Sequence, residues 1–402
     1  MQNEAEPTVL LTQGWCRSSY SALRGLAQNG VRVVVSDTSR IGMCQASRLA
    51  HARGRYASPY ADPEGFVTDV TGLCERHGIG LILPGHEEGE LLVAAREAGR
   101  LPPGVALPMV DAATLALVND KDRMSRLARE WGVAVATIVD YSNPAEAGRV
   151  SDPAREYVAR ARRGNSSKGV RFSKGGEALA QTLAEMMAAF DLDPARPPIV
   201  QERVEGDGWG VSCLYWHGER IASFTHRRLQ EKVATGGTST LRVSAAHPAM
   251  EADAHRLLGG LKWHGLAMLE FKHDPATGRH AFIEVNPRLW GSIDLSLSAG
   301  VNFPWLLYLA QTRGPAVARA HFRPARQGVV ARWLLGDVIR RLDLARRGRL
   351  GSALRLADGA RADSFDDAKW DDPLVLFGEG LYYLAKGLRT HSMNPLEAGM
   401  VR

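Results

Sequence analysis

The sequence predicts a mixed α/β protein with a doubly wound parallel sheet at its N-terminus, an α+β region in the middle and a helical tail. Three observations support this fold class. Short apolar runs alternate with helical patterns at the start of the chain, as in "TVLLTQG", "SALRGLAQNG" and "VRVVVSD". Short strand-like runs with glycine-rich connections follow from about residue 155 to 290, and a helical pattern follows about residue 313. Apolar strands that alternate with helices are typical of a parallel sheet covered on both faces.

The first domain is expected to span residues 1–112. It opens with the strand, helix and strand quoted above, and "GIGLILPGHEEGELLVAAREAG" adds another strand that leads into a helix. The prolines of "LPPGVALP" then interrupt the alternation, because proline lacks a backbone donor and has a fixed φ. We place the end of the domain shortly after them.

The rest of the chain is expected to form three parts. Residues 113–200 begin with the helical stretch "DAATLALVNDKDRMSRLAREWGVAV" and continue as a small subdomain, residues 201–312 form a larger subdomain, and residues 313–402 form the helical tail. The segment "YSNPAEAG" is interpreted as a flexible linker because it is rich in turn-forming residues. The tail has enough apolar residues for a helix that packs on the body or on a second subunit.

Composition restricts the class of protein. The hydrophobic content of 45% and the charged content of 23% are ordinary for a soluble globular protein. The first residues, "MQNEAEP", carry acids where a signal peptide would carry basic residues, and no apolar run approaches the length of a membrane span. We therefore expect a cytoplasmic protein without a membrane partner. Four scattered cysteines without CxxC pairing argue against a zinc site and a disulfide framework.

The net charge of +6 does not indicate a nucleic-acid partner. The basic excess is heaviest in "RWLLGDVIRRLDLARRGRLGSALRLADGAR", where leucines recur at helical spacing and acids interrupt the arginines. This pattern is typical of a solvated helix face. Aromatic residues that could stack on bases do not alternate with the arginines.

A nicotinamide dinucleotide site is also disfavoured. Asp37 ends the second strand, where a ribose-binding carboxylate would lie. The turn "TQGWCRSSY" has one glycine where the dinucleotide fingerprint needs three. We interpret Asp37 as an ordinary acid at the end of a strand.

A pair of acids in "LAMLEFKHDPATGRHAFIEVNP" indicates a metal site. Glu270 and Glu284 lie on two strands joined by the turn "DPATG", and paired neighbours on one face of an antiparallel sheet come within about 5 Å. Two carboxylates that close are costly unless a cation lies between them. Asn286 extends the same face and completes a set of oxygen donors that suits Mg²⁺. Arg288 follows just beyond, where it could bind a phosphate.

Two further segments could bind a nucleotide, although each is weak evidence alone. In "YVARARRGNSSKGVRF" a polar loop between two strand patterns offers backbone N–H groups and a lysine to phosphate oxygens, and a hairpin with a basic tip explains it equally well. In "PPIVQERVEG" a strand edge beside an acid could read the rim of an adenine, or belong to any amphipathic hairpin.

Taken in order, these motifs resemble the ATP-grasp superfamily. The resemblance rests on Lys121, the loop "RRGNSSKGV", the hinge "IVQERVEG", Glu270 and "EVNPR", and it covers about residues 8–312. The segments "HRRLQEKVATGGTST" and "NPRLWGSIDLSLSAGVNFP" are most similar to carboxylate-amine ligases related to the carbamoyl phosphate synthetase large chain. The resemblance implies an ATP-grasp fold with a Rossmann-like domain before it. It also implies a homodimer, because dimerisation is common in this superfamily.

The resemblance also implies ATP and Mg²⁺, or Mn²⁺ in its place, and it assigns residues. Arg160 stands where many members have a lysine, and Asp207 is a weak match for the ribose contact. Glu270, Glu284 and Asn286 match the metal ligands, and Arg288 matches a catalytic phosphate-binding arginine. The residues matching the nucleotide site are Lys121, Arg160, Gly164, Ser166, Ser167, Lys168, Gly169, Gln201, Glu202, Val204 and Asp207.

The substrate residues are less certain from the pattern. Arg227 and Arg228, which could bind a carboxylate or a phosphate, precede a loop with Gly236, Gly237, Thr238 and Ser239, whose backbone could approach an oxyanion. The alternative for the arginines is a surface ion pair with Glu231. Glu87 and Glu88 follow a strand at the sheet's carboxyl edge. They could hold the ammonium of a substrate, or serve as first-turn acids that suit a helix dipole.

The resemblance implies that a small-molecule carboxylate is activated as an acyl phosphate and joined to an amine, which yields an amide or peptide bond, ADP and phosphate. Two alternatives remain open. One is an ATP-grasp enzyme that acts on bicarbonate or on a phosphorylated acceptor. The other is a nucleotide-binding protein without catalysis, for which we would expect loss of a metal carboxylate or of Arg288.

Overall fold

The N-terminal region is a parallel sheet between helices, as predicted. The computed structural model describes residues 6–164, 169–232, 238–346, 348, 349, 351 and 361–390. The first sheet has the order β3-β2-β1-β4 and its strands run parallel, with Val9 opposite Val33 and Leu11 opposite Leu83. Its elements are β1 (Thr8–Leu11), α1 (Arg17–Ala27), β2 (Val33–Asp37), α2 (Met43–Ala46), β3 (Ala52–Arg55), α3 (Pro63–His77), β4 (Ile79–Leu83) and α4 (Gly89–Glu97).

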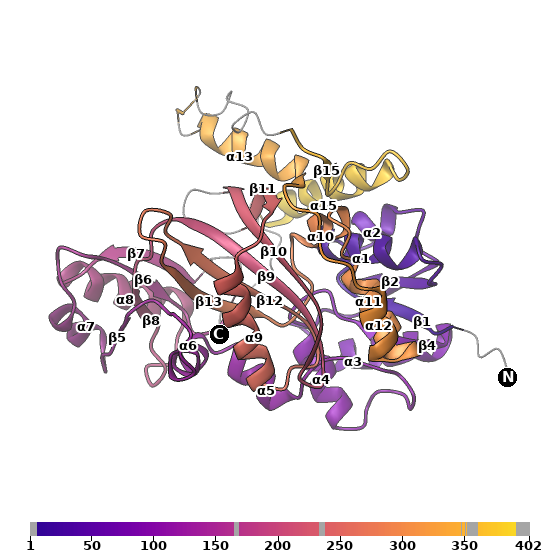
Figure 1. The fold of residues 1–402 in the computed structure, drawn as a ribbon, viewed down its shortest axis with the longest axis horizontal. Coiled ribbons are helices and arrows are strands. Elements are labelled where there is room, and N and C mark those ends of the chain that lie inside the picture. The colour runs from indigo at the N-terminus through magenta and orange to yellow at the C-terminus, as the bar shows by residue number, and fades with distance from the viewer. Residues whose placement is uncertain are drawn as a thin grey trace.

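A small antiparallel sheet follows, in the order β5-β8-β6-β7. Its helices α7 and α8 lie with it on the left of Figure 1. The prediction of a flexible linker at residues 141–148 is wrong, because helix α7 begins within this segment. Asn143 accepts a hydrogen bond from the backbone N–H of Glu146 at 3.0 Å and Pro144 opens a helix, which is a favourable pair at a helix start. The elements are α5 (Ala112–Val118), α6 (Lys121–Glu130), β5 (Ile138–Val139), α7 (Pro144–Val150), β6 (Glu156–Arg160), β7 (Val170–Lys174), α8 (Glu177–Phe190) and β8 (Ile199–Glu202).

The large sheet lies in the centre of Figure 1 and has the order β13-β12-β9-β10-β11-β14-β15. The prediction of strands alone over residues 155–290 missed α8 and α9, whose apolar residues recur at helical spacing and are buried. The elements are β9 (Asp207–Trp216), β10 (Glu219–Glu231), β11 (Ser239–Ser244), α9 (Pro248–Gly260), β12 (Gly265–His273), β13 (His280–Asn286), α10 (Ile293–Ser298) and α11 (Phe303–Arg313).

The tail is helical, as expected, but it also completes the large sheet. Strand β14 pairs with β11, and β15 pairs with β14. Asp366, just after β15, binds Arg17 of α1 at 2.7 Å and also contacts Arg242 of β11. The tail is therefore part of the folded body. Its elements are α12 (Pro315–His321), β14 (Val330–Arg332), α13 (Leu334–Arg346), β15 (Ser364–Phe365) and α15 (Leu374–Thr390).

One apolar core joins the first domain to the large sheet. Val9 and Leu11 of β1 belong to the same buried cluster as Met268 of β12 and Trp290. Because interiors pack at crystal-like density, this core fixes the carboxyl edge of the first sheet against the end of β13. Among the described residues, the helices are each too short or too polar to cross a membrane. All four cysteines are free and buried.

Candidate active site

Lys121 is placed by the start of α6. Asp120 caps this helix by accepting hydrogen bonds from the backbone N–H groups of Asp122 and Arg123 at 3.1 and 3.2 Å. The backbone N–H of Lys121 donates to the carbonyl of Arg162 at 2.9 Å. Its ammonium donates to the carbonyl of Gly164 at 2.5 Å, at the beginning of the predicted phosphate loop. The helix start therefore holds a buried cation beside that loop.

The two predicted metal carboxylates are direct neighbours. Glu270 of β12 pairs with Glu284 of β13, and Gly210 of β9 lies opposite Glu270 on its other side. The missing side chain of Gly210 leaves room for the ring of His226, which a Cβ at this position would meet at 2.3 Å. Asn286 is on the same strand as Glu284, and its amide lies 3.4 Å from an oxygen of Glu270. All three side chains therefore share one face at the end of the sheet.

Positive charges surround Glu284. Arg160 donates to its carboxylate at 2.7 Å, and the ammonium of Lys121 lies 3.6 Å from the same oxygen. Burial raises the pKa of Glu284, but the charges of Lys121, Arg160, Arg288 and Arg228 together lower it by more, so that its pKa lies below the usual value for glutamate. Burial lowers the pKa of Lys121, although Glu284 opposes this shift. Glu284 is therefore held ionised.

Glu270 has its own cationic partner. Arg228 of β10 contacts its carboxylate at 2.6 Å and lies 3.6 Å from Glu231. Arg228 thus contacts a predicted metal ligand, Glu270. It also lies near Glu231, the ion-pair partner that the sequence suggested as the alternative to substrate binding. Two carboxylates and one amide are a donor set that fits a hard cation such as Mg²⁺, with remaining positions for water or phosphate oxygens. Within the described part of the chain, no group of three or more His, Cys, Asp and Glu residues could hold a metal by itself.

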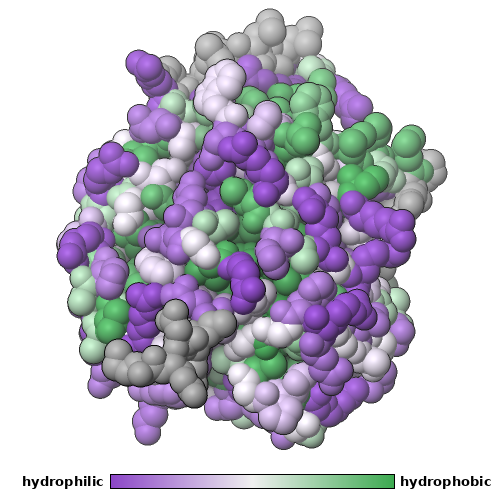
Figure 2. Space-filling view, turned by 90° about the vertical axis from the view of Figure 1, so that its right-hand side faces the viewer, coloured by the Kyte–Doolittle hydropathy of each residue, from purple (hydrophilic) through white to green (hydrophobic). Residues whose placement is uncertain are grey.

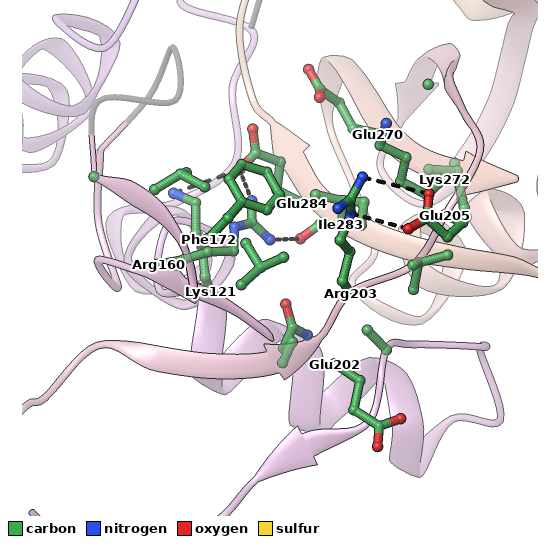
Figure 3. A pocket seen from close by; sticks show the side chains of 18 of the residues that line it. Lys121, Arg160, Phe172, Glu202, Arg203, Glu205, Glu270, Lys272, Ile283 and Glu284 are labelled. Carbon is green, nitrogen blue, oxygen red and sulfur yellow. Dashed lines mark hydrogen bonds and ion pairs between the residues drawn. The ribbon is translucent and has the colours of Figure 1, made fainter. Parts of the chain in front are cut away.

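Apart from Asn286, these side chains line a cavity of about 210 Å³ between the small and the large sheet. In Figure 3, Lys121 and Arg160 converge on Glu284, and Glu270 lies farther along the same sheet. Strands β6, β7, β8, β10, β12 and β13 all contribute to its walls. The lining residues include Lys121, Val158, Arg160, Arg163, Gly164, Gly169, Phe172, Gln201, Glu202, Val204, Glu205, Arg228, Glu231, Glu270, Lys272, Ile283 and Glu284.

The predicted adenine hinge borders this cavity. Gln201, Glu202 and Val204 all line it. The carboxylate of Glu202, however, pairs with Arg155 and points away from the cationic cluster in Figure 3. The hinge therefore offers the cavity backbone groups rather than this carboxylate.

A second cavity of about 240 Å³ adjoins the first. The two share Lys121, Arg163, Gly164 and Glu284 in their linings. The second cavity reaches from the end of β13 to the carboxyl edge of the first sheet. It is lined by Pro59, Tyr60, Glu87, Glu88, Glu90, Leu91, Val118, Asn119, Lys121, Arg163, Gly164, Glu284, Val285, Asn286, Pro287 and Arg288.

Glu87 and Arg288 form an ion pair in this second cavity. The Nε of Arg288 donates to Glu87 at 2.8 Å, and an Nη donates to the carbonyl of Leu289 at 3.0 Å. His86 contacts the other oxygen of Glu87. Burial, and then the charge of Arg288, lowers the pKa of His86 well below its usual value. The imidazole is therefore neutral at pH 7.

Glu88 has a different position from Glu87. It is 1% exposed and accepts hydrogen bonds from Thr12 at 2.5 Å and from the backbone N–H groups of Gly85 and His86 at 2.9 and 3.1 Å. Burial raises its pKa. This geometry favours a role for Glu88 in holding the turn before α4, and it speaks against Glu88 as an ammonium ligand.

Other predicted residues lie away from both cavities or cannot be placed. Arg227 pairs with Asp207 at 3.0 Å between β10 and β9, and neither borders the two cavities described above. Ser239 lies in β11, opposite Glu231, and the carbonyl of Thr238 accepts from the backbone of Lys232. The geometry therefore gives no support to Asp207 as the ribose contact or to Arg227 as a catalytic residue. Five predicted residues, Ser166, Ser167, Lys168, Gly236 and Gly237, lie outside the described residues.

The sequence analysis also missed residues that border the cavities. Arg163 borders both and lies 3.5 Å from Glu90 of α4. Phe172 borders the first cavity and is 45% exposed, which is unusual for a phenylalanine. Its strand position opposite Val158 could have been predicted from the hairpin pattern. The contact of Arg163 with Glu90 spans 73 residues and had no local signal.

Comparisons with known proteins agree with this architecture. Residues 195–335 match the family described as "ATP-grasp in the biosynthetic pathway with Ter operon". No curated protein matches the chain significantly by sequence. A biotin carboxylase from Campylobacter jejuni, solved as a β,γ-ATP complex, is similar in structure with a TM-score of 0.62 and 14% identity, over 81% of this chain and 74% of that one.

Two other solved structures are similar over most of their length. N5-carboxyaminoimidazole synthetase from Staphylococcus aureus, complexed with ADP, has a TM-score of 0.58 and 14% identity over 77% of both chains. An L-amino acid ligase from Bacillus licheniformis has a TM-score of 0.55 and 16% identity, over 76% of this chain and 75% of that one. The likeness to these solved structures, together with the family match over residues 195–335, shows that the chain has the ATP-grasp fold.

Proposed function

We propose that this ATP-grasp protein is a ligase that uses ATP to activate a carboxylate and joins it to an amine. The observation that carries the proposal is the pair of adjoining cavities. One has a cationic and carboxylate lining suited to Mg-ATP, the other has charges of both signs, and Lys121 and Glu284 border both. The transferred phosphate and its acceptor can therefore meet at one place.

The side chains of the first cavity suit a triphosphate. Lys121, Arg160 and Arg228 can neutralise phosphate oxygens, and backbone groups of the hinge can meet an adenine. Glu270, Glu284 and Asn286 would hold Mg²⁺, or Mn²⁺, which when bound supplies further positive charge to the phosphates. Arg288, at the border of the second cavity, would bind the phosphoryl group as it moves to the acceptor.

The proposed reaction has two displacements. An oxygen of the substrate carboxylate attacks the γ-phosphorus, the bond from this phosphorus to the β–γ bridging oxygen breaks, and ADP leaves. The amine nitrogen then attacks the acyl carbon, phosphate leaves and the nitrogen loses a proton. Positioning and electrostatic stabilisation are enough for both steps, and a closed site protects the acyl phosphate from water.

The lining of the second cavity supports an amino acid as a substrate. Glu87 and Glu90 can attract an ammonium, and Arg163 and Arg288 can attract a carboxylate. Leu91, Val118, Val285 and the prolines add apolar walls. A bicarbonate ion would need only the positive part of this lining. One of the solved structures with a similar fold is an L-amino acid ligase.

The proposal is tested by ADP and phosphate release from Mg-ATP across amino acids and other small carboxylates, singly and in pairs, with mass spectrometry of products. We expect release that depends on a pair, and a product lighter than the sum of the pair by one water. Release with bicarbonate alone, independent of any amine, would contradict the proposal and favour a carboxylating enzyme. Tight Mg-ATP binding without turnover on any acceptor would favour a nucleotide-binding protein.

A further inference from the structure

Helix α15 is held on the body by its inner face. Val375, Glu379 and Tyr383 of this helix are 0, 2 and 5% exposed. Tyr382 stacks on Trp15 with ring centroids 4.9 Å apart. A Cβ added at Gly378 would come within 2.6 Å of α2, so the two helices approach closely. The position of α15 therefore does not depend on its outer face.

The outer face of α15 carries an exposed apolar stripe. We define it by five side chains that are 61, 67, 53, 57 and 73% exposed, which are Leu374, Phe377, Leu381, Leu384 and Leu388. Their spacing alternates between three and four residues over the helix Leu374–Thr390. This is the a/d pattern of a coiled-coil seam, with a period of 3.5 residues. Hydrophobic side chains gather in the upper right of Figure 2, at the height where Figure 1 shows α15.

The residues beside the stripe are small and uncharged. Gly380 and Gly387 occupy the g positions and Ala385 occupies an e position, whereas the e-position Gly378 is already packed against α2. In coiled coils these positions usually carry the charges that select a partner. Here an identical helix would meet no like charge across the seam, and a Cβ added at Gly380 would meet nothing within 4 Å. A second α15 could therefore approach closely.

The exposed area matches a modest interface. Trp370, four residues before the stripe, is 102% exposed. With aromatic side chains of about 150–250 Å² and leucines of about 100 Å², Trp370 and the stripe offer roughly 600 Å² per copy. Two copies would bury about 1,200 Å², the lower end for specific interfaces. Such a patch is also at the upper end of those found on monomers.

We propose that the stripe is an interface between two copies of this chain, in which the α15 helices pair around a twofold axis. An identical seam is self-complementary, so one patch serves both copies and the assembly closes as a dimer. Because the area is modest, the dimer should dissociate on dilution into the micromolar range. This inference is independent of the proposed reaction.

The first test is sedimentation velocity of the full chain from about 1 to 100 μM. We expect a mass near twice 43.8 kDa at the upper end. Leu381→Glu and Leu384→Glu should each weaken dimerisation by more than about 100-fold, because each dimer would bury two carboxylates. The matched control is Leu342→Glu on α13, where the leucine is 55% exposed, and it should leave the mass unchanged. Retained ATP binding and circular dichroism would show that the variants fold.

Crosslinking gives a second, independent readout. Leu381 is the middle residue of the stripe, so Leu381→Cys would meet its copy in either a parallel or an antiparallel pair. The four native cysteines are buried and should not react. Oxidation should crosslink Leu381→Cys and leave Leu342→Cys monomeric on a denaturing gel.

Three results would overturn the proposal. The first is a wild-type monomer at 100 μM. The second is a dimer that both glutamate variants retain, which would place the interface elsewhere. The third is evidence that something else covers the stripe. The protein could bind anionic phospholipid vesicles without dimerising, or it could stay monomeric until residues 391–402 are deleted.

Discussion

Replacement of Glu284 by glutamine is the sharpest test of the site. The variant keeps the shape of the side chain and one amide oxygen that Arg160 can still bind, but it removes the negative charge. Arg160 lies 2.7 Å and Lys121 3.6 Å from this carboxylate, whose side chain is 18% exposed. A charge-assisted hydrogen bond becomes an ordinary one, and two buried cations lose a compensating charge, so we expect a loss of about 3 kcal/mol in the free energy of unfolding. The fold should survive.

A separate effect on turnover is expected. If Glu284 holds the metal that neutralises the transferring phosphate, its loss should cost about 3–4 kcal/mol of transition-state stabilisation, or a factor of 10² to 10³ in kcat. Measuring both stability and kcat therefore distinguishes a metal ligand from a purely structural acid, because loss of a structural acid would lower stability and leave kcat unchanged.

The assay is ADP release at saturating Mg-ATP and acceptor, together with the Mg²⁺ concentration for half-maximal rate. Glu205→Gln is the matched control. Glu205 also borders the first cavity, but its side chain is 66% exposed and pairs with Arg203. We expect the control to stay within about threefold of wild type. If Glu284→Gln also stayed within threefold, the metal assignment would be refuted.

Three further predictions concern other parts of the site. Burial, followed by Arg228 and Arg242, lowers the pKa of His226 to about 3. Its contribution to stability is therefore present above pH 6.5 and is lost as the pH falls, by about 2–3 kcal/mol between pH 6 and 4. In urea unfolding, the free energy of unfolding of His226→Gln should fall less steeply between pH 6 and 4 than that of the wild type. Equal pH dependence in the two proteins would contradict this prediction. Glu87→Gln should lower kcat more than it raises the KM for ATP, because Arg288 loses the carboxylate that orients it. A change confined to the KM for ATP would argue against that role. Lys168→Ala should raise the KM for ATP if the loop binds phosphates, and an unchanged KM would mean that the loop has another function.

The sequence was most informative where local pattern decides the structure. The fully apolar run before Asp37 predicts a strand buried on both faces, and β2 is buried along its whole length. The short turn after His273 fixes the register of its hairpin, and for this reason the pairing of Glu270 with Glu284 was predictable. An asparagine before a proline also signals a helix start, and the linker prediction at Asn143 overlooked it.

Burial and long-range contacts decided the rest. Glu87 and Glu88 are adjacent and chemically identical, yet Glu87 binds Arg288 and Glu88 is buried against Thr12 and the backbone of Gly85. Nothing local separates them. Arg227 and Arg228 are also adjacent, but successive strand residues point to opposite faces. The register of β10 with β9, and of β9 with β12, turns Arg228 toward Glu270. To predict which of the two arginines faces Glu270, one must know the order of the strands in the sheet, and no short sequence motif contains this information.

The ion pairs of the site suggest how one set of side chains can serve two partners. Arg160 of the small sheet pairs with Glu284 of the large sheet, and Arg228 pairs with Glu270 within the large sheet, across the intervening strand β9. Each cation is also a phosphate ligand by chemistry, and each carboxylate a metal ligand. Mg-ATP would supply phosphates for the arginines and a metal ion for the carboxylates at the same time. Each charged side chain could therefore exchange its partner in the protein for a partner in the ligand and stay paired. Binding of Mg²⁺ alone would leave the buried arginines unpaired, and binding of ATP alone would leave the buried carboxylates unpaired, and an unpaired buried charge is costly. Mg²⁺ and ATP should therefore bind with strong positive coupling, and calorimetry of each alone and of both together would measure it. Additive binding would show that the ion pairs persist in the complex.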